Sequence, residues 1–296
     1  MKKSYGEKIL DIVIVLIMII LSVIMLYPYL NQLAIALNDG TDTMLGGVTF
    51  YPRKPTWTNF AAILDNKEII GAMGVTVFSA LTSTALTLFV CVGAAYGIKK
   101  KDLPGRNIII KYLMLPSYIS AGVIPVFILY RYLGLMNNIL VYILPGAFLF
   151  YYVIIIRSFL ESIPGVLEEA AYIDGANEIQ ILFKVVLPLA KPILATIALW
   201  KLVAVWNDWT TTLYYVFNKK ELYSLQYVIM QLVKQNEMLA KMTAESAMTG
   251  GIVRARPTSE SLKAAAVIVS TVPIVMSYPF LQKYFIKGVT VGAVKE

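Results

Sequence analysis

Charge-poor apolar stretches recur along the chain at lengths close to that of a bilayer-spanning helix. A hydrocarbon core about 30 Å thick is crossed by about 20 residues of α-helix. Six windows have suitable length and composition, at residues 12–30, 69–98, 108–130, 138–156, 192–209 and 264–285. Because only helices and closed barrels satisfy every backbone polar group in lipid, the pattern predicts an all-α polytopic membrane protein with six transmembrane helices.

The first window has an alternative interpretation as a cleaved signal peptide. Lys2 and Lys3 precede it, and Ala34-Ile35-Ala36 fits a small-residue cleavage site. However, the apolar stretch is longer than the usual signal-peptide core of about 7–15 residues. The length therefore favours a retained transmembrane helix.

The orientation follows from basic residues in the short connections. The second connection carries Lys99, Lys100, Lys101 and Arg106, whereas the third carries only Arg131. Since cytoplasmic loops are enriched in Lys and Arg, both termini are expected to be cytoplasmic. The outer loops are then residues 31–68 and 210–263, and residues 157–191 form a cytoplasmic loop.

The larger outer loop contains a pattern typical of an amphipathic helix. Leu225, Val228, Ile229 and Leu232 follow one another at helical spacing. Such a helix either packs on the transmembrane bundle or presents a docking surface, and the pattern alone does not separate the two.

Composition narrows the functional classes. Of 296 residues, 58% are hydrophobic and 15% are charged, which places the chain in a bilayer. The net charge of +8 is typical of cytoplasmic loops facing anionic lipid, so no nucleic-acid partner is expected. There is no histidine and one cysteine, Cys91, so we expect no metal site, cofactor or catalytic centre in this chain.

The energy source must lie elsewhere if transport is driven by ATP. No G-x-x-x-x-G-K-[ST] phosphate-binding loop occurs in the sequence. A proton-coupled secondary transporter is the rival class, but it normally places Asp or Glu inside its spans. None lies within the windows except Asp208, at the outer edge of the fifth. A membrane-embedded enzyme is a third class, for which no catalytic constellation is found.

Residues 163–192 read as a soluble-looking helical insertion. Pro164 suits a first helical turn, and Glu168 and Glu169 favour a helix N-terminal half. Gly175 lies where a helix would need a left-handed stop, and Asn177 with Gln180 has capping-box spacing. The sequence predicts two short helices meeting at a glycine corner. The alternative is an ordinary re-entrant or amphipathic connection.

This stretch resembles the EAA loop of ABC importer permeases. The resemblance is carried by Glu169-Ala170-Ala171, then Gly175 after three residues, then Val185-Val186-Leu187-Pro188 after nine more. Val185 departs from the usual Ile. Asp174-Gly175-Ala176, Trp206-Asn207-Asp208 and the tail YPFLQKYFIKGVTVGAVKE are similar to the maltose-type carbohydrate group, especially the complex-carbohydrate permeases of Gram-positive bacteria.

The resemblance covers nearly the whole chain and implies a single permease domain, residues 1–296, with the MetI-like ABC importer permease fold. It implies a multi-pass protein of the bacterial cytoplasmic membrane that imports a carbohydrate, an oligosaccharide in particular. The implied partners are a second homologous permease chain, two ATPase subunits that bind ATP and Mg, and an extracytoplasmic solute-binding lipoprotein. An ABC permease for a non-sugar solute is the first alternative, and a secondary transporter the next.

The loop at residues 157–191 would then form a coupling helix against the ATPase, with Glu169 as the main polar contact and Gly175 as the corner. The residues that the resemblance assigns to coupling are Glu168, Glu169, Ala170, Ala171, Asp174, Gly175, Ala176 and Pro188.

The substrate path is indicated by Lys201, about halfway along the fifth window. A lysine at this depth usually faces a wet cavity or the bundle interior. It favours an acidic sugar as substrate, and the alternative is a lysine that is paired within the bundle or that snorkels outward. Trp200, Trp206 and Trp209 offer apolar faces for sugar rings, with Asn207 and Asp208 as hydrogen-bonding groups, although interfacial belting explains Trp206 and Trp209 at least as well.

Overall fold

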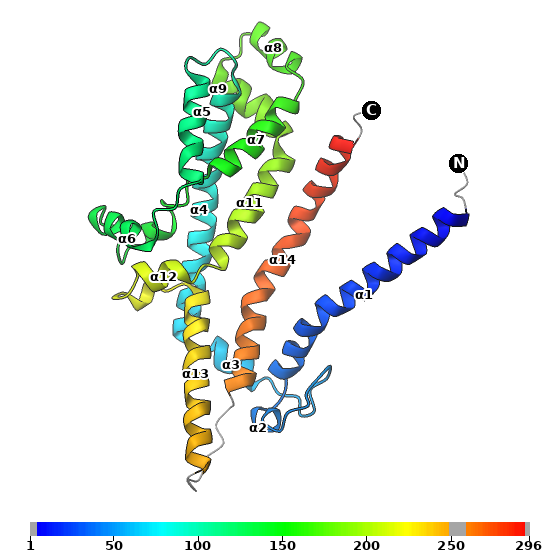
Figure 1. Cartoon of the computed structure of the whole chain (residues 1–296), viewed down its shortest axis with the longest axis vertical. Helices are drawn as coiled ribbons and strands as arrows, with labels where there is room; N and C mark the ends of the chain where they lie inside the picture. Colours follow the sequence, from blue (N-terminus) through cyan, green and yellow to red (C-terminus); the bar gives the residue numbers. More distant parts are fainter. Residues whose placement is uncertain (1–4, 249–258, 294–296) are drawn as a thin grey trace. The chain divides into compact units, whose positions relative to one another are not determined.

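The computed structural model describes residues 5–248 and 259–293 (Figure 1). Helices account for 76% of the structure, and the described residues contain no strand. Their one β-type pairing is an isolated bridge between Asn38 and Pro55. The all-α fold class is therefore confirmed for the described part of the chain.

The helices follow one another in chain order with short connections. They are α1 (Tyr5–Ala36), α2 (Gly40–Thr43), α3 (Thr58–Leu64), α4 (Lys67–Lys99), α5 (Arg106–Met114), η1 (Leu115–Ser117), α6 (Val123–Tyr132), η2 (Ile139–Tyr142), α7 (Phe150–Ser162), α8 (Val166–Ile173), α9 (Glu178–Ile181), η3 (Leu182–Val186), α10 (Leu187–Leu189), α11 (Lys191–Trp206), α12 (Thr210–Tyr215), η4 (Lys220–Leu222), α13 (Leu225–Met248) and α14 (Ser259–Ala293).

The chain forms two compact units. The first comprises residues 1–70 and 229–273, and the second comprises residues 71–228 and 274–296. Within the second unit, α7 packs against α11 and α6 packs against α12.

Two helices are each long and apolar enough to cross a bilayer unaided. The 32 residues of α1 contain the predicted window 12–30, and the 33 residues of α4 contain the window 69–98. At 1.5 Å per residue each is about 48–50 Å long, more than the hydrocarbon core requires. None of the apolar window of α1 is buried inside the structure, whereas 44% of that of α4 is.

The third and fourth windows are not the single helices that the sequence predicts. Residues 108–130 are divided into α5, η1 and α6, separated by an irregular stretch that ends at Gly122, whose φ is +79°. In residues 138–156, η2 ends at Tyr142 and α7 begins only at Phe150. Pro116 and Pro145 explain the breaks, because proline removes a backbone donor and clashes with the preceding helical turn.

The sixth window lies within α14, whereas the fifth, predicted to end at residue 209, is helical only as far as Trp206, where α11 ends. Helix α11 begins at a bend of 79° after the α9–α10 segment, and α7 and α8 meet at 76°. By length and composition, the described residues hold two spanning helices, or up to four if each bent pair is one span.

The core of the second unit joins the loop at residues 157–191 to the long helices. Ile156 of α7, Ile181 of α9, Val186 of η3 and Ile197 of α11 are almost completely buried in one apolar cluster. Cys91 of α4 is buried in the same cluster. The loop is thus packed against the bundle at its α9–η3 end.

The predicted amphipathic helix is present as α13. Leu225, Val228 and Ile229 are buried at its start. The backbone N–H of Leu225 also donates to the Thr76 hydroxyl on α4 at 2.9 Å.

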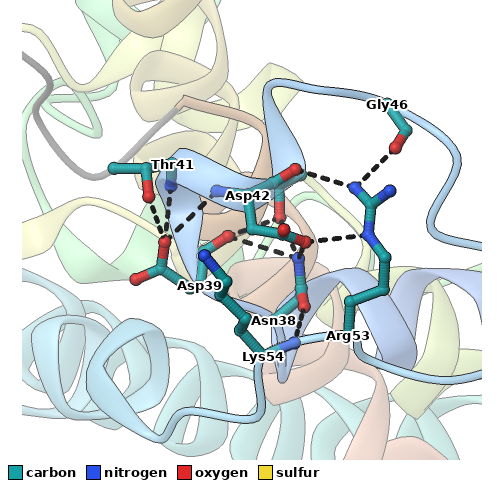
Figure 2. A network of polar contacts seen from close by, with 8 residues as sticks. Asn38, Asp39, Thr41, Asp42, Gly46, Arg53 and Lys54 are labelled. Atoms are coloured by element: carbon teal, nitrogen blue, oxygen red, sulfur yellow. Dashed lines mark hydrogen bonds and ion pairs between the residues drawn. The ribbon is translucent and has the colours of Figure 1, made fainter.

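Within the first unit, a network of hydrogen bonds and an ion pair joins the residues directly after α1 to Arg53 and Lys54 (Figure 2). The Asn38 amide donates to the Asp42 carboxylate at 2.9 Å and accepts from the Lys54 backbone N–H at 2.8 Å. The Arg53 guanidinium pairs with the same carboxylate at 2.9 Å. The hydrogen bond from Asn38, and then Arg53, hold the pKa of Asp42 below its usual range.

Candidate functional site

The corner between α8 and α9 has the form predicted from the sequence. Gly175 follows α8 with φ +81°, a left-handed conformation that side chains other than glycine adopt at a cost. Asn177 and Gln180 form a capping box, with hydrogen bonds of 2.9 and 3.0 Å. Pro164 is displaced from its predicted place, because α8 begins two residues later, at Val166.

The outer side of this corner is exposed and partly apolar. Glu169, Ala170, Asp174 and Gly175 are exposed, as is Pro188 in α10. Ile173 is 86% exposed, and the adjacent Tyr172 is 65% exposed. Ala171 and Ala176, by contrast, are partly buried against the core. An exposed apolar corner at the end of a short helix is a suitable contact for another protein.

Glu168 differs from Glu169 because it is paired within the chain. Its carboxylate is bonded to the ammonium of Lys99, and Lys100 lies 3.8 Å away. Lys99 and Lys100 lie at the end of α4. Glu169 forms no ion pair with any described residue, so the two adjacent carboxylates have different surroundings.

Glu178 ties α9 to the same end of α4. It accepts from the Tyr96 hydroxyl at 2.6 Å and pairs with Lys100 at 2.9 Å. These two hydrogen bonds hold the pKa of Glu178 below its usual range. Together Tyr96, Lys99, Lys100, Glu168 and Glu178 form what we call the α4 ion cluster. It connects both short helices of the corner to one long helix.

Lys201 is held inside the second unit by the break in the fourth window. Its side chain is 6% exposed, and its ammonium donates to the backbone carbonyl of Gly146 at 2.8 Å. The Thr87 hydroxyl on α4 donates to the same carbonyl at 3.0 Å. No carboxylate lies within ion-pair distance of Lys201 among the described residues. The sequence left open that Lys201 is paired within the bundle, and in the structure its partner is the Gly146 carbonyl.

Lys201 also lines a cavity of about 340 Å³. Asn207, Asp208 and Trp209 line it as well, so four of the predicted path residues are brought together. The Asp208 carboxylate accepts from the Thr210 hydroxyl at 2.8 Å and the Thr211 N–H at 3.0 Å. The remaining walls are formed by Tyr130, Val141, Tyr142, Pro145, Gly146, Ala204, Val205, Thr210, Thr211 and Tyr215.

The other two predicted path residues lie elsewhere. Trp200 stacks on Tyr151, with ring centroids 6.2 Å apart, and does not line the cavity. Trp206 is buried and is also absent from the cavity wall. Sequence reasoning missed Gly146 and Thr87. The adjacent Pro145-Gly146 pair in the middle of an apolar window was the available signal for a broken span with free carbonyls.

Comparisons with known proteins place these features in context. The family described as "Binding-protein-dependent transport system inner membrane component" matches residues 91–291. Protein LplC of Bacillus subtilis (strain 168) is 31% identical over 295 residues, covering 100% of this chain and 98% of that protein. The polygalacturonan/rhamnogalacturonan transport system permease protein YtcP of the same organism is 30% identical, covering 98% and 99%.

A solved structure is also similar. It is that of a bacterial ABC transporter involved in the import of the acidic polysaccharide alginate. The likeness has a TM-score of 0.81 at 29% sequence identity and covers 96% of this chain and 99% of that chain.

The α4 ion cluster predicts a charge-swap rescue. Glu168→Lys should lower the thermal unfolding midpoint of the purified chain, because it places a third cation beside Lys99 and Lys100. The double variant Lys99→Glu/Glu168→Lys should recover most of the loss, since the pair is re-formed with its ends exchanged. Glu169→Lys is the matched control and should leave the midpoint nearly unchanged. Equal losses for Glu168→Lys and the double variant would contradict the pairing.

The contact at Gly146 predicts a second coupled pair. A Cβ at this position would collide with the Lys201 ammonium. Gly146→Ala should therefore displace the ammonium, the flexible end of its side chain, and destabilise the chain by about 0.5–1.5 kcal/mol, the net contribution of the lost hydrogen bond, and the loss should shrink in a Lys201→Ala background. Gly97→Ala on α4, where a Cβ meets nothing within 4 Å, serves as the control in denaturant unfolding. Additive effects of the two substitutions would show that the contact is absent.

Proposed function

The chain belongs to the family of binding-protein-dependent transport system inner membrane components, and on that premise we propose that it carries an acidic oligosaccharide across the bacterial inner membrane. It has the MetI-like ABC permease fold, and it is the transport subunit of an ABC importer, with ATP hydrolysis on a separate subunit. The acidic substrate is the part that rests on Lys201.

The buried ammonium is the observation that carries this proposal. An ammonium has three N–H donors, and Lys201 uses one of them on the Gly146 carbonyl. Its positive charge has no carboxylate partner among the described residues, in surroundings where an unpaired charge is costly. A uronate carboxylate entering the cavity would supply the missing partner.

The rest of the cavity suits the hydroxyl groups of a sugar. The side chains of Asn207 and Asp208 supply an amide and a carboxylate, and Trp209 adds an aromatic face. The hydrogen bonds from Thr210 and Thr211 fix the Asp208 carboxylate, so its remaining lone pairs face a defined direction. The relatives named for polygalacturonan and alginate transport support the same substrate class. A non-sugar solute is the alternative and has no feature of the cavity in its favour.

We further propose six spans with both termini in the cytoplasm and a single permease domain over residues 1–296. The third and fourth spans would each be broken, at residues 115–122 and 143–149, where side chains and neighbouring helices satisfy the backbone. The outer loops would be residues 31–68 and 210–263. This topology places residues 157–191 in the cytoplasm.

The proposed assembly contains a second permease chain, two ATPase subunits that bind ATP and Mg, and an extracytoplasmic solute-binding protein. The exposed corner of α8, with Glu169, Ala170 and Gly175, would dock on an ATPase subunit. The α4 ion cluster would then pass movement of the corner to α4, because it bonds both α8 and α9 to the end of that helix. Glu168 acts in this scheme as an internal tie, while Glu169 is free for the partner.

The docking role predicts the effect of a substitution at the corner. Gly175→Asp should abolish transport and weaken ATPase association without preventing membrane insertion, because it strains a left-handed position and adds charge at the contact. Gly165→Asp is the matched control: it adds the same charge to the same loop at φ −59°, in the N-cap position that favours Asp. Uptake and co-purification of the ATPase measure the effect. Normal transport and a retained ATPase in Gly175→Asp would refute the coupling assignment.

The substrate role predicts selective loss of acidic substrates. Lys201→Met should reduce uptake of uronate-containing oligosaccharides far more than uptake of neutral ones of equal length, because only the former lose a charge partner. Lys219→Met removes an exposed lysine elsewhere and should affect neither. Equal losses for acidic and neutral substrates would contradict the substrate role and would show that Lys201 acts only through its structural hydrogen bond to Gly146.

A further inference from the structure

The chain between Asp42 and Arg53 is unusual for a loop because it contains no charged residue. Of its large apolar side chains, Val48 is buried and the other four are uncovered. Leu45 is 79% exposed and Tyr51 is 83% exposed, and Met44 and Phe50 are more than half exposed. We call residues 44–51 the apolar loop. Water-facing loops are normally polar, so this surface requires an apolar neighbour.

The apolar loop folds back along α1. The Phe50 ring packs edge-on against the Tyr27 ring, with centroids 5.1 Å apart. The Asn31 side-chain amide donates to the carbonyls of Val48 and Thr49, both at 2.9 Å. The loop is thus attached to α1 at two points. One is Asn31, directly after the apolar run that ends at Leu30, and the other is Tyr27, one helical turn or about 6 Å earlier.

The backbone of this segment is satisfied by side chains. Besides the two bonds from Asn31, the Arg53 guanidinium donates to the carbonyls of Asp42 at 2.9 Å and Gly46 at 2.6 Å (Figure 2). A loop in water does not need such bonds, because water satisfies its carbonyls. Backbone beside hydrocarbon does need them. Gly46 and Gly47, with φ of +71° and +77°, provide the turn that brings the loop back.

We propose that the apolar loop is inserted in the bilayer interface beside α1, with phospholipid as its partner. The argument rests on the proposal that α1 spans the membrane. No part of its apolar window is covered by the rest of this chain, as suits a helix in contact with lipid, and the loop contacts α1 at the end of that window. Tyr27, Phe50 and Tyr51 then belong to the aromatic belt typical of this depth. The Asn38–Asp42–Arg53 network holds the loop in place.

The lone cysteine of the chain makes the test direct. In a Cys91→Ala background, single cysteines at Leu45 and Tyr51 would carry spin labels, with Ile20→Cys as the lipid control and Asp65→Cys as the water control. The full chain, purified with its partner subunits, is reconstituted in vesicles of phosphatidylethanolamine and phosphatidylglycerol. Collision with oxygen, which concentrates in lipid, is compared with collision with a water-soluble nickel chelate.

Labels at positions 45 and 51 are expected to favour oxygen, as at position 20, with a smaller ratio because they lie at a shallower depth. A preference for nickel, as at position 65, would overturn the proposal. Protection from both reagents would also overturn it, in favour of a protein partner on this surface. If the label at position 20 favours nickel, α1 itself is not in lipid, and the span proposal fails together with this one. If only positions 45 and 51 favour nickel, the spans stand and the loop proposal alone fails.

Discussion

Backbone carbonyls without a helical partner set the constraint on which the rest of this structure depends. Lipid offers them no hydrogen bond, so where a helix is broken at membrane depth, as we propose for the fourth span, side chains, neighbouring helices or ordered water must satisfy them. Between η2 and α7 the helix is interrupted at Pro145 and Gly146, and Thr87 and Lys201 both donate to the freed Gly146 carbonyl. Three segments that are distant in sequence are thereby joined at one oxygen atom.

This junction explains why the cavity lies where it does. The break in the fourth window leaves space beside α11, and the hydrogen bonds from Thr87 and Lys201 fix the irregular backbone at Gly146. Pro145, Gly146 and Lys201 line the cavity for this reason, together with the chain that follows α11. A continuous helix over residues 138–156 would have used the Gly146 carbonyl internally and left Lys201 without an acceptor. The break and the buried lysine therefore depend on each other.

Local features of the chain were predictable from sequence, and contacts between distant segments were not. The α8–α9 corner follows from residues within a dozen positions of one another, since Gly175 supplies the left-handed conformation and Asn177 and Gln180 cap the next helix. The depth of Lys201 was also visible. Its acceptor was not, because Gly146 lies 55 positions away and its carbonyl becomes available only when the fourth window breaks. Hydropathy counts Pro145 and Gly146 as acceptable in a span, so the window appeared continuous.

The same limit applies to the loop at residues 157–191. Glu168 and Glu169 are adjacent glutamates, and the sequence around them does not indicate which one is paired within the chain. Only the position of Lys99, 69 residues earlier, makes one an internal tie and leaves the other exposed. The difference between their surroundings therefore comes from the packing of α8 against the end of α4.

The shared acceptor also bears on whether Lys201 is available for a ligand. A carbonyl oxygen has two lone pairs, and Thr87 occupies one of them. If the ammonium turns toward a carboxylate in the cavity, the Gly146 carbonyl keeps its bond from Thr87, so the broken span is not left with an unsatisfied group. If the ammonium were the only donor to this carbonyl, turning away would leave the carbonyl without a hydrogen bond, at a cost of about 1–3 kcal/mol. The second donor removes that cost, so the proposed pairing of Lys201 with a charged substrate would leave the broken span satisfied.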